Sequence, residues 1–282
     1  LGNIKVVRTI NGMGRIFTTS NFKNKILKFV YKSIQKRLKK IVDYTIFQNT
    51  ENYNYFIKNN LVKEENSSVI KSSGINLKNY STPVKEEDKN KLRIELNIND
   101  KQPTFVLISR LIKQKGVLNY LEAAQKSFDN GYKFNFLLVG QIDSNKDAVS
   151  IEQINKYKCC VNYLGKQTNI KELLSISDVF VLPTYYSEGV PRVLLEASAM
   201  SLALLTTNMP GCNDVLLDGI NGLNININDS NDLYEKIKHL TVDMDVLSNF
   251  KKNALKHVTN FSLDKVSSES LEIYKYVSNS LK

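Results

Sequence analysis

Two glutamates in the stretch YYSEGVPRVLLEASAM could do chemistry because of where they stand. Glu188 lies on a turn with Gly189, and Glu196 lies in an otherwise apolar run. Pro191 is favoured at the first position of a helix, so the pattern predicts that a helix begins there. The N–H groups of Gly189 and Val190 would then lie at a helix N-terminus, where anions bind readily. The stretch therefore predicts an anion site flanked by two carboxylates.

Both carboxylates suit hydroxyl groups better than a bare phosphate. Glu188 would repel a phosphate, but it can accept hydrogen bonds from hydroxyl groups carried beside one. Glu196, if largely buried and unsatisfied, would cost several kcal/mol. An ion pair with Arg192 is the alternative, and pairs at this helical spacing contribute only about 0.2–0.5 kcal/mol. We therefore favour a ligand with several hydroxyl groups at Glu196.

Cations follow a second apolar run. After TFVLIS come Arg110, Lys113, Lys115 and Gly116, in the sequence SRLIKQKG. Such a turn suits a diphosphate, because an arginine can bind phosphate oxygens through two parallel hydrogen bonds. A solvated basic turn without a ligand is the alternative that these residues leave open.

Glycines stand at two more turns of this kind. Gly140 follows FNFLLV, while Gly165 follows VNYL and precedes Lys166 and Gln167. Glycine lets a backbone approach a ligand closely, although turn glycines also occur without one. In open α/β sheets, ligands bind beyond the carboxyl ends of the strands, so we expect these turns to gather at one edge.

Two other groups of residues match known chemistry but lie in the wrong context. Asp243 and Asp245 form an Asp-x-Asp that resembles the metal site of some sugar transferases, yet they follow a helical segment rather than a strand. His239 and His257 lie in predicted helices without a nearby cluster of ligands. We therefore predict no metal site.

Short β-rich runs alternate with helical ones from about residue 103, and these elements must position the turns. The predicted strands are TFVLISR, FNFLLVG, VNYLG, DVFVLPT, ALLTT and GLNININ, and the predicted helices cover residues 116–128, 148–157, 169–177, 191–200 and 213–218. Several strands are apolar throughout, as expected when both faces of a sheet are covered. The pattern predicts a parallel, doubly wound α/β domain.

The first hundred residues predict the remainder of another α/β unit. Its candidate strands are NIKVVRTI, YTIFQNT and SSVIKSSGIN, and a basic helical stretch covers residues 21–41. Residues 81–100 are polar and contain Pro83, which indicates a linker. After residue 230 we expect helices at 230–239, 243–257 and 264–280. Because a β-like run begins at once, we also expect that a part of this unit precedes Leu1.

The net charge of +11 belongs to one segment. The first 40 of the 282 residues contain 11 lysines and arginines and no Asp or Glu, so the rest of the chain is neutral. In a nucleic-acid-binding protein that is basic throughout, the positive charge would be spread along the whole chain. We therefore expect no nucleic-acid partner. No apolar run approaches the length of a membrane span, and the segment LGNIKVVRTINGMG does not have the pattern that we expect of a secretory signal. The three cysteines are expected to be free thiols of a reducing cytosol.

With these residues assembled, the chain resembles the family 4 glycosyltransferases of the GT-B fold. The resemblance spans residues 1–282 and is carried by ISRLIKQKGV, LPTYYSEGVPRVLLEASAM and PGCNDVLLDGINGL. The segments INGMGRIF and EGVPRVLLEA are similar to those of bacterial transferases that extend undecaprenyl-diphosphate-linked sugars, such as N-acetylgalactosaminyltransferases.

The resemblance implies retaining transfer of a hexose or N-acetylhexosamine from a UDP-sugar, without a metal or another cofactor. Two Rossmann-like domains would face a cleft, with an incomplete N-terminal acceptor-side domain at 1–85 and a donor-binding domain at 86–263. The helix at 264–282 would pack back on the N-terminal domain. The acceptor would be a lipid-diphosphate-linked sugar or a glycan, in the assembly of bacterial surface polysaccharide such as O-antigen or capsule.

The resemblance also assigns roles to residues. Arg110 and Lys115 would hold the donor diphosphate and stabilise the leaving group. Glu188 would bind sugar hydroxyls beside the amides of Gly189 and Val190, and Glu196 would hold the ribose hydroxyls. The turns at Gly140 and at 165–167 would also contact the donor, the latter through its backbone at the base. This set comprises Arg110, Lys115, Gly140, Gly165, Lys166, Gln167, Glu188, Gly189, Val190 and Glu196.

The sequence departs from the family pattern at the acceptor side. Asn11 stands where many members carry a histidine, so we assign no general base. Asn11, Gly12 and Gly14 are the acceptor-side candidates. The frequent Gly-Lys-Pro after the Glu-x7-Glu helix is replaced by residues 201–203, SLA. A second hypothesis follows, in which the chain is a truncated or degenerate protein that binds a nucleotide sugar without catalysis.

The basic segment at 21–41 has an apolar face among its lysines, made by Leu27, Val30, Tyr31, Ile34, Leu38 and Ile41. This pattern suits an anionic membrane surface, where a polyprenyl acceptor resides. We therefore expect a cytoplasmic protein that binds peripherally to the inner face of the cytoplasmic membrane. A helix that packs on the core and exposes a solvated basic face is the alternative.

Overall fold

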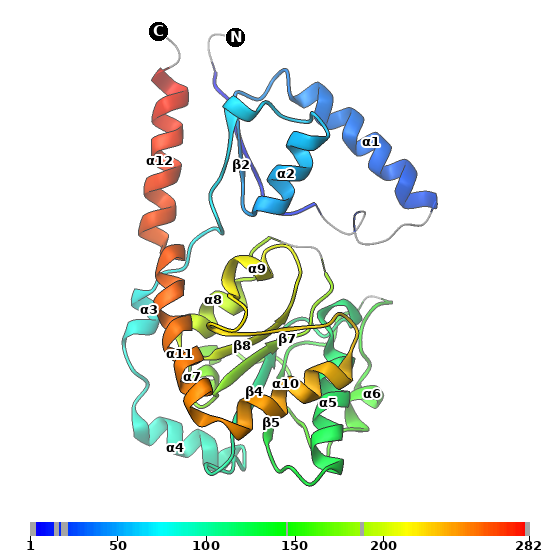
Figure 1. The fold of residues 1–282 in the computed structure, drawn as a ribbon, viewed down its shortest axis with the longest axis vertical. Helices are drawn as coiled ribbons and strands as arrows, with labels where there is room; N and C mark the ends of the chain where they lie inside the picture. The colour runs from blue at the N-terminus through cyan, green and yellow to red at the C-terminus, as the bar shows by residue number, and fades with distance from the viewer. Residues whose placement is uncertain (1–3, 14–16, 18–21, 145, 187–188, 280–282) are drawn as a thin grey trace. The chain divides into compact units, whose positions relative to one another are not determined.

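The structure is a computed structural model that describes residues 4–13, 17, 22–144, 146–186 and 189–279 (Figure 1). Contacts divide the chain into two compact units. Unit 1 comprises residues 1–76, 186–192 and 260–282, and unit 2 comprises residues 77–185 and 193–259.

Unit 2 is built on a six-stranded parallel sheet. Its strands are β4 (Thr104–Ile108), β5 (Asn135–Val139), β6 (Asn162–Tyr163), β7 (Val179–Leu182), β8 (Ala203–Thr207) and β9 (Gly222–Ile225). They lie in the order β6-β5-β4-β7-β8-β9, and every pairing is parallel. Each of the six predicted strands therefore exists, and the predicted parallel α/β sheet is confirmed.

Helices connect these strands and cover the sheet. They are α3 (Lys78–Ser81), α4 (Glu86–Glu95), α5 (Val117–Asp129), α6 (Ile151–Asn155), α7 (Ile170–Ser175), α8 (Arg192–Ala199), α9 (Cys212–Val215), α10 (Ser230–Val242) and α11 (Met244–Val258). The predicted helix at 191–200 corresponds to α8, which begins one residue later than expected. Helices α5 and α10 pack against each other (Figure 1).

The central strands are buried on both faces, as their apolar composition predicts. All five residues of β4 and all four of β7 are buried. Successive side chains of a strand point to opposite faces. Phe105 and Leu107 thus share one cluster with residues of α5, α10 and α11, including Tyr120, Ile237 and Leu247.

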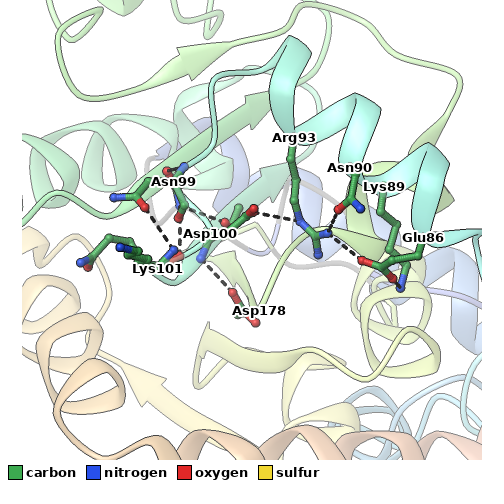
Figure 2. A network of polar contacts seen from close by, with 11 residues as sticks. Glu86, Lys89, Asn90, Arg93, Asn99, Asp100, Lys101 and Asp178 are labelled. Carbon is green, nitrogen blue, oxygen red and sulfur yellow. Dashed lines mark hydrogen bonds and ion pairs between the residues drawn. The ribbon is translucent and has the colours of Figure 1, made fainter.

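The segment at 81–100 is not a linker, because it contains the ten-residue helix α4. Figure 2 shows a polar network that includes residues of this helix and of the segment after it. Arg93 lies 2.9 Å from the carboxylate of Glu86 and 3.3 Å from that of Asp100. Asp178, labelled in Figure 2, stands just before β7. It accepts from the N–H of Thr104 at 3.0 Å and pairs with Lys251 at 2.8 Å.

Unit 1 contains a three-stranded parallel sheet in the order β1-β2-β3. The strands are β1 (Val7–Ile10), β2 (Tyr44–Phe47) and β3 (Ser67–Val69), and the helices are α1 (Phe22–Leu38), α2 (Thr50–Lys58) and α12 (Leu263–Asn279). The predicted strands and the basic helix of this region are therefore confirmed.

The two faces of this sheet are covered by different helices, because neighbouring residues of β2 point in opposite directions. Phe47 packs with Phe56 of α2 and Tyr31 of α1. Ile46 packs with Val266 and Ile273 of α12. Helix α12 is thereby part of the core of unit 1. Within the residues that the structure describes, no helix has the length and the hydropathy of a membrane span.

Candidate functional site

The strand order of unit 2 identifies where a ligand would bind. From β4 the chain proceeds to β5 and β6 on one side, and from β7 to β8 and β9 on the other. Strands β4 and β7 are paired neighbours, with Phe105 opposite Val179. A crevice forms outside the carboxyl ends of the strands at such a reversal, and ligands of open α/β sheets bind there. The turn after β4, which carries Arg110 and Lys115, thus lies at the switch point.

The turn after β4 carries the predicted cations and is bonded to the segment after β7. The carbonyl of Gln114 accepts hydrogen bonds from the N–H of Tyr185 at 2.9 Å and from Oγ1 of Thr184 at 3.1 Å. Gly116 has a φ of 72°, and a Cβ built on it would lie 2.0 Å from the carbonyl oxygen of Pro183. Only glycine fits this left-handed turn without displacing the backbone of Pro183.

This close packing buries Lys115. Its exposed fraction is 7%, whereas the neighbouring Lys113 is exposed. A lysine is seldom buried unless it has polar or charged partners, so the environment of Lys115 is polar. Its position beside the segment after β7 makes it the cation of this turn that is best fixed in space.

Arg110 is also part of the turn, but it is held from another side. Its Nη1 lies 3.7 Å from the Asp143 carboxylate, and its side chain is 57% exposed. The backbone around it is fixed, since the N–H of Leu111 donates to Gln141 and that of Lys113 donates to Asp147. The guanidinium therefore has a fixed origin and an exposed head that can turn toward an anion.

The glycine turns after β5 and β6 lie together. The N–H of Gly140 donates to the carbonyl of Gly165 at 2.8 Å, and the hydroxyl of Tyr163 donates to the carbonyl of Gly140 at 3.1 Å. Burial raises the pKa of Tyr163, so it remains a neutral donor. Next to Gly165, the amide of Gln167 donates to the carbonyl of Leu164 at 2.6 Å, and Lys166 is exposed.

Glu196 lies on α8, which follows the segment after β7. Its neighbours Leu194, Leu195 and Ala197 are buried, whereas Glu196 itself is half-buried. The expectation of a largely buried carboxylate was too strong. A half-buried carboxylate keeps access to solvent and to a ligand while apolar neighbours fix its stem.

Four further candidates among the described residues lie in unit 1. Gly189 packs against the backbone of Asn11, because a Cβ built on Gly189 would lie 2.2 Å from the Asn11 carbonyl oxygen. Asn11 is exposed, and Gly12 and Val190 are half-buried. This contact accounts for a glycine at position 189 without invoking any ligand. Glu188 and Gly14 lie outside the described residues.

Several residues that shape the site were missed by the sequence reasoning. Gln114, Asp143, Tyr163 and Thr184 all hold the turns in place. Asp143 stands three residues after Gly140, which is the only signal that could have suggested it. Gln114 acts through its backbone carbonyl, so its side chain carries no such signal.

The two groups set aside in the sequence have structural roles. The carboxylate of Asp243 accepts from the N–H groups of Asp245 and Val246 and thereby caps α11. His257 lies 3.0 Å, through Nε2, from the carbonyl oxygen of Asp214. The cysteines are free thiols, with Cys212 buried and Cys159 exposed.

Comparison with known proteins gives consistent matches. The family model described as Glycosyl transferases group 1 matches residues 88–257. The chain is 35% identical, over 95% of its length and 69% of the relative's, to N,N'-diacetylbacillosaminyl-diphospho-undecaprenol alpha-1,3-N-acetylgalactosaminyltransferase of Campylobacter jejuni. It is 29% identical, over 90% of its length and 64% of the relative's, to UDP-Gal:alpha-D-GlcNAc-diphosphoundecaprenol alpha-1,3-galactosyltransferase of Escherichia coli.

Solved structures match over almost the whole chain. A glycosyltransferase from Rickettsia africae is 24% identical with a TM-score of 0.77, covering 96% of this chain and 70% of that one. Anabaena HepE in complex with UDP and glucose is 19% identical with a TM-score of 0.81, covering 96% and 72%. This likeness confirms the predicted GT-B fold.

Proposed function

Because the chain belongs to the group 1 glycosyl transferase family, we propose that it transfers a sugar from a UDP-sugar to a lipid-diphosphate-linked acceptor. The transfer proceeds with retention and serves the assembly of a surface polysaccharide. One observation carries the proposal. The turn after β4, which bears Arg110 and Lys115, is hydrogen-bonded to the segment after β7 at the switch point of the sheet.

The donor diphosphate is assigned to the turn after β4. Lys115 is a fixed cation in a poorly solvated position, where an electrostatic contact to a developing charge is stronger than in water. Arg110 adds a planar pair of donors that suits phosphate oxygens. Together they neutralise the UDP leaving group as the bond to the sugar breaks.

The two ends of the donor are assigned to carboxylates and turns. Glu196 accepts hydrogen bonds from the ribose hydroxyls, and Glu188, beside Gly189 and Val190, accepts them from the sugar. The turns at Gly140 and at Gly165, Lys166 and Gln167 contact the base. We assign the donor-binding domain to 86–263 and the acceptor-side domain to 1–85, with 264–282 packing on the latter.

The acceptor class follows from the relatives, whose names specify undecaprenyl-diphosphate-linked acceptors. A third relative, 26% identical over 77% of this chain, is the capsular polysaccharide biosynthesis glycosyltransferase CapM of Staphylococcus aureus. Asn11, Gly12 and Gly14 are the acceptor-side residues in this proposal. Either an O-antigen or a capsule is a suitable product class.

Helix α1 would bring the protein to the membrane surface that carries such an acceptor. Phe22 and Phe29 are 79% and 72% exposed, and Ile26, Leu27, Val30 and Ile34 are also exposed. Six lysines and arginines lie on the same helix, which carries no acidic residue. Exposed apolar side chains among cations suit an anionic lipid surface, so we place the protein on the cytoplasmic face of the membrane.

Part of α1 also packs on the core, as the alternative interpretation of the helix expects. The Tyr31 ring meets that of Phe56 edge-on, with centroids 6.2 Å apart. The two interpretations are compatible because different residues serve them. Tyr31 anchors the helix to unit 1, whereas Phe22 and Phe29 are available to lipid.

A panel of UDP-sugars with undecaprenyl-diphosphate-linked acceptors tests the activity. We expect release of UDP and a product with retained anomeric configuration for at least one pair. UDP binding without transfer to any acceptor would favour the non-catalytic hypothesis. If neither UDP nor a UDP-sugar binds, the assignment of the donor site is wrong.

Vesicle flotation tests the membrane surface separately. We expect binding that requires phosphatidylglycerol, weakens with salt, and is reduced by the double substitution Phe22→Ser/Phe29→Ser. The matched control is Phe128→Ser/Leu255→Ser, which replaces two exposed apolar residues of unit 2. Equal loss in both double variants, or binding without anionic lipid, would contradict the role of α1.

A further inference from the structure

A cavity of about 510 Å³ in unit 1 is lined mainly by cations. It lies between β1, the end of α1, the start of β2 and the segment before β3. Its lining residues are Arg8, Lys36, Lys39, Lys40, Ile41, Val42, Asp43, Thr45, Val62, Lys63 and Asn66. Asp43 precedes β2, Thr45 is its second residue and Asn66 precedes β3, so the cavity lies toward the amino ends of these strands. Asn11 and Gly12, in contrast, follow the carboxyl end of β1.

Five cations line this cavity against a single carboxylate. That carboxylate, on Asp43, is already engaged: it accepts from the N–H of Val6 at 2.8 Å and pairs with Lys5 at 3.2 Å. Lys39 donates to the neutral side chain of Asn60. Among the described residues, no ion pair joins any of the five lining cations to an acid. Within the described part of unit 1, ion pairs therefore do not offset their mutual repulsion.

Arg8 shows that the site is built rather than a chance collection of surface lysines. Its Nε donates to Oγ1 of Thr45 at 3.0 Å, and its Nη1 donates to Oε1 of Gln35 at 2.6 Å. Gln35 is only 7% exposed. Both partners are neutral, and Nη2 is buried without a hydrogen-bond partner in the described residues. The guanidinium is thus held in one orientation, while its charge is left uncompensated.

Burial lowers the pKa of Arg8, because desolvation disfavours the charged guanidinium. Uncompensated charge in a partly buried place is costly. An anion in the cavity would remove this cost and the repulsion between the lysines at once.

A helix end alone does not account for this arrangement. Lysines near a helix C-terminus are stabilised by the helix dipole, and this explains Lys36 and Lys39 at the end of α1. It does not explain Arg8, which comes from β1, or Lys63, which comes from the segment before β3. Cations from three separate elements converge on one cavity.

We propose that this cavity binds a phosphate group, with Arg8 fixed at its wall and Lys36, Lys40 and Lys63 as the mobile cations. The volume suffices for a phosphate or a diphosphate, and charge-assisted hydrogen bonds to phosphate are the strongest that these side chains make. The group belongs either to a phospholipid headgroup or to a free phosphate compound. The site is distinct from the proposed donor site, because none of its lining residues belongs to the donor-binding set.

Titration of inorganic pyrophosphate into ¹⁵N-labelled protein tests the proposal. We expect shifts of the amide resonances of Arg8, Ile41, Val42 and Asp43. Arg8, Ile41, Val42 and Asp43 line the cavity, and none of them belongs to the turn at 110–116. Shifts confined to 110–116, or none near Arg8 at saturation, would overturn the proposal.

Matched charge variants give the energetic test. The triple substitution Lys36→Gln/Lys40→Gln/Lys63→Gln removes three lining cations, and we expect affinity to fall by about tenfold or more. The control Lys133→Gln/Lys252→Gln/Lys256→Gln removes three exposed lysines of unit 2 and the same net charge. Equal affinities of the two triple variants would overturn the proposal. Thermal unfolding of both variants verifies that each is folded.

Vesicles distinguish the two sources of the phosphate group. If the source is a lipid headgroup, the lining variant loses binding to vesicles of phosphatidylcholine with phosphatidylglycerol, and the control variant retains it. If the source is a free phosphate compound, the lining variant loses pyrophosphate affinity but binds these vesicles as the control does. Arg8→Lys is a further variant for both measurements, because it keeps the positive charge but loses the planar pair of donors. We expect it to weaken binding of the phosphate group.

Discussion

The turn after β4 and the cavity beside β1 are two cationic places built in opposite ways. Lys115 is held by main-chain bonds, because Gln114 and Gly116 are packed against the segment after β7. Arg8 is held by side-chain bonds to Gln35 and Thr45, and the lysines around it come from other elements. The turn after β4 therefore has one fixed backbone conformation. The cavity beside β1 is instead lined by cations that no ion pair neutralises among the described residues. The comparison predicts sharp effects of substitution in unit 2 and graded ones in unit 1.

The largest effect is expected at Lys115. Replacing it with alanine should lower the turnover number by about a hundredfold, because a fixed cation in a dry position is lost from the leaving group. Lys113→Ala is the matched control on the same turn, since Lys113 is exposed and should change turnover little. Initial rates of UDP release give the turnover numbers of the two variants. Similar rates would show that Lys115 has no electrostatic role in the reaction.

The rigidity of that turn can be broken directly with Gly116→Ala. The new Cβ would collide with the carbonyl of Pro183 at a positive φ, so we expect the free energy of unfolding to fall by about 2 kcal/mol. Gly131→Ala is the control: its φ is 83°, but a Cβ would meet no atom within 4 Å. Its cost should be about 1 kcal/mol, from the backbone strain alone. Urea denaturation of both variants checks the difference.

A smaller effect is expected at Asp143, which pairs with Arg110 across 3.7 Å. Asp143→Asn should raise the KM for the donor about threefold and leave the turnover number nearly unchanged, because a long ion pair whose arginine is exposed contributes little. Steady-state kinetics with varied donor separate the two constants. A lower KM would mean that Asp143 competes with the donor phosphates for Arg110 instead of orienting it.

The smallest effect is expected at Asp43, on the wall of the cavity. The hydrogen bond from the Val6 N–H and the partner Lys5 lower the pKa of this carboxyl below its ordinary value of 3.8. A lowered folded-state pKa means that ionised Asp43 stabilises unit 1 above the unfolded pKa, and that this stability is lost as the pH falls through the folded pKa.

Asp43→Asn should therefore lower stability at neutral pH by less than about 1 kcal/mol, since the pair is partly exposed and screened. The difference from the unsubstituted protein should vanish at strongly acidic pH. Urea unfolding at both pH values is the measurement. A difference that grows on acidification would contradict the assignment.

The sheet of unit 2 was predictable because its strands are continuous apolar runs buried on both faces, as in TFVLI. The position of the turns after these strands was predictable as well, because a parallel sheet places the carboxyl ends of its strands at one edge. Helix α4 was missed because none of its residues is buried, so the segment shows only the polar composition of a linker. The contacts of this helix include ion pairs of Arg93 with Glu86, in the same helix, and with Asp100. Such polar contacts leave no apolar periodicity in the sequence.

Other features have no signature in one sequence. The bond from Tyr185 to Gln114 joins backbone groups far apart in the chain, which any residue could supply. The cavity beside β1 depends on the pairing of Arg8 with Thr45 across the sheet. The basic composition of the first 40 residues predicted that this region is positively charged. That Arg8 and Lys63 line the same cavity could be seen only in the structure.

The central claim is that Glu196 and the turn after β4 hold the ribose and the diphosphate of one nucleotide in unit 2. Calorimetric titration with UDP and with its 2′,3′-dideoxy analogue, on the unsubstituted protein and on Glu196→Gln, tests it most directly. The account predicts that the unsubstituted protein prefers UDP by about tenfold or more and that Glu196→Gln loses this preference. An equal preference in both proteins would contradict the assignment of the ribose to Glu196.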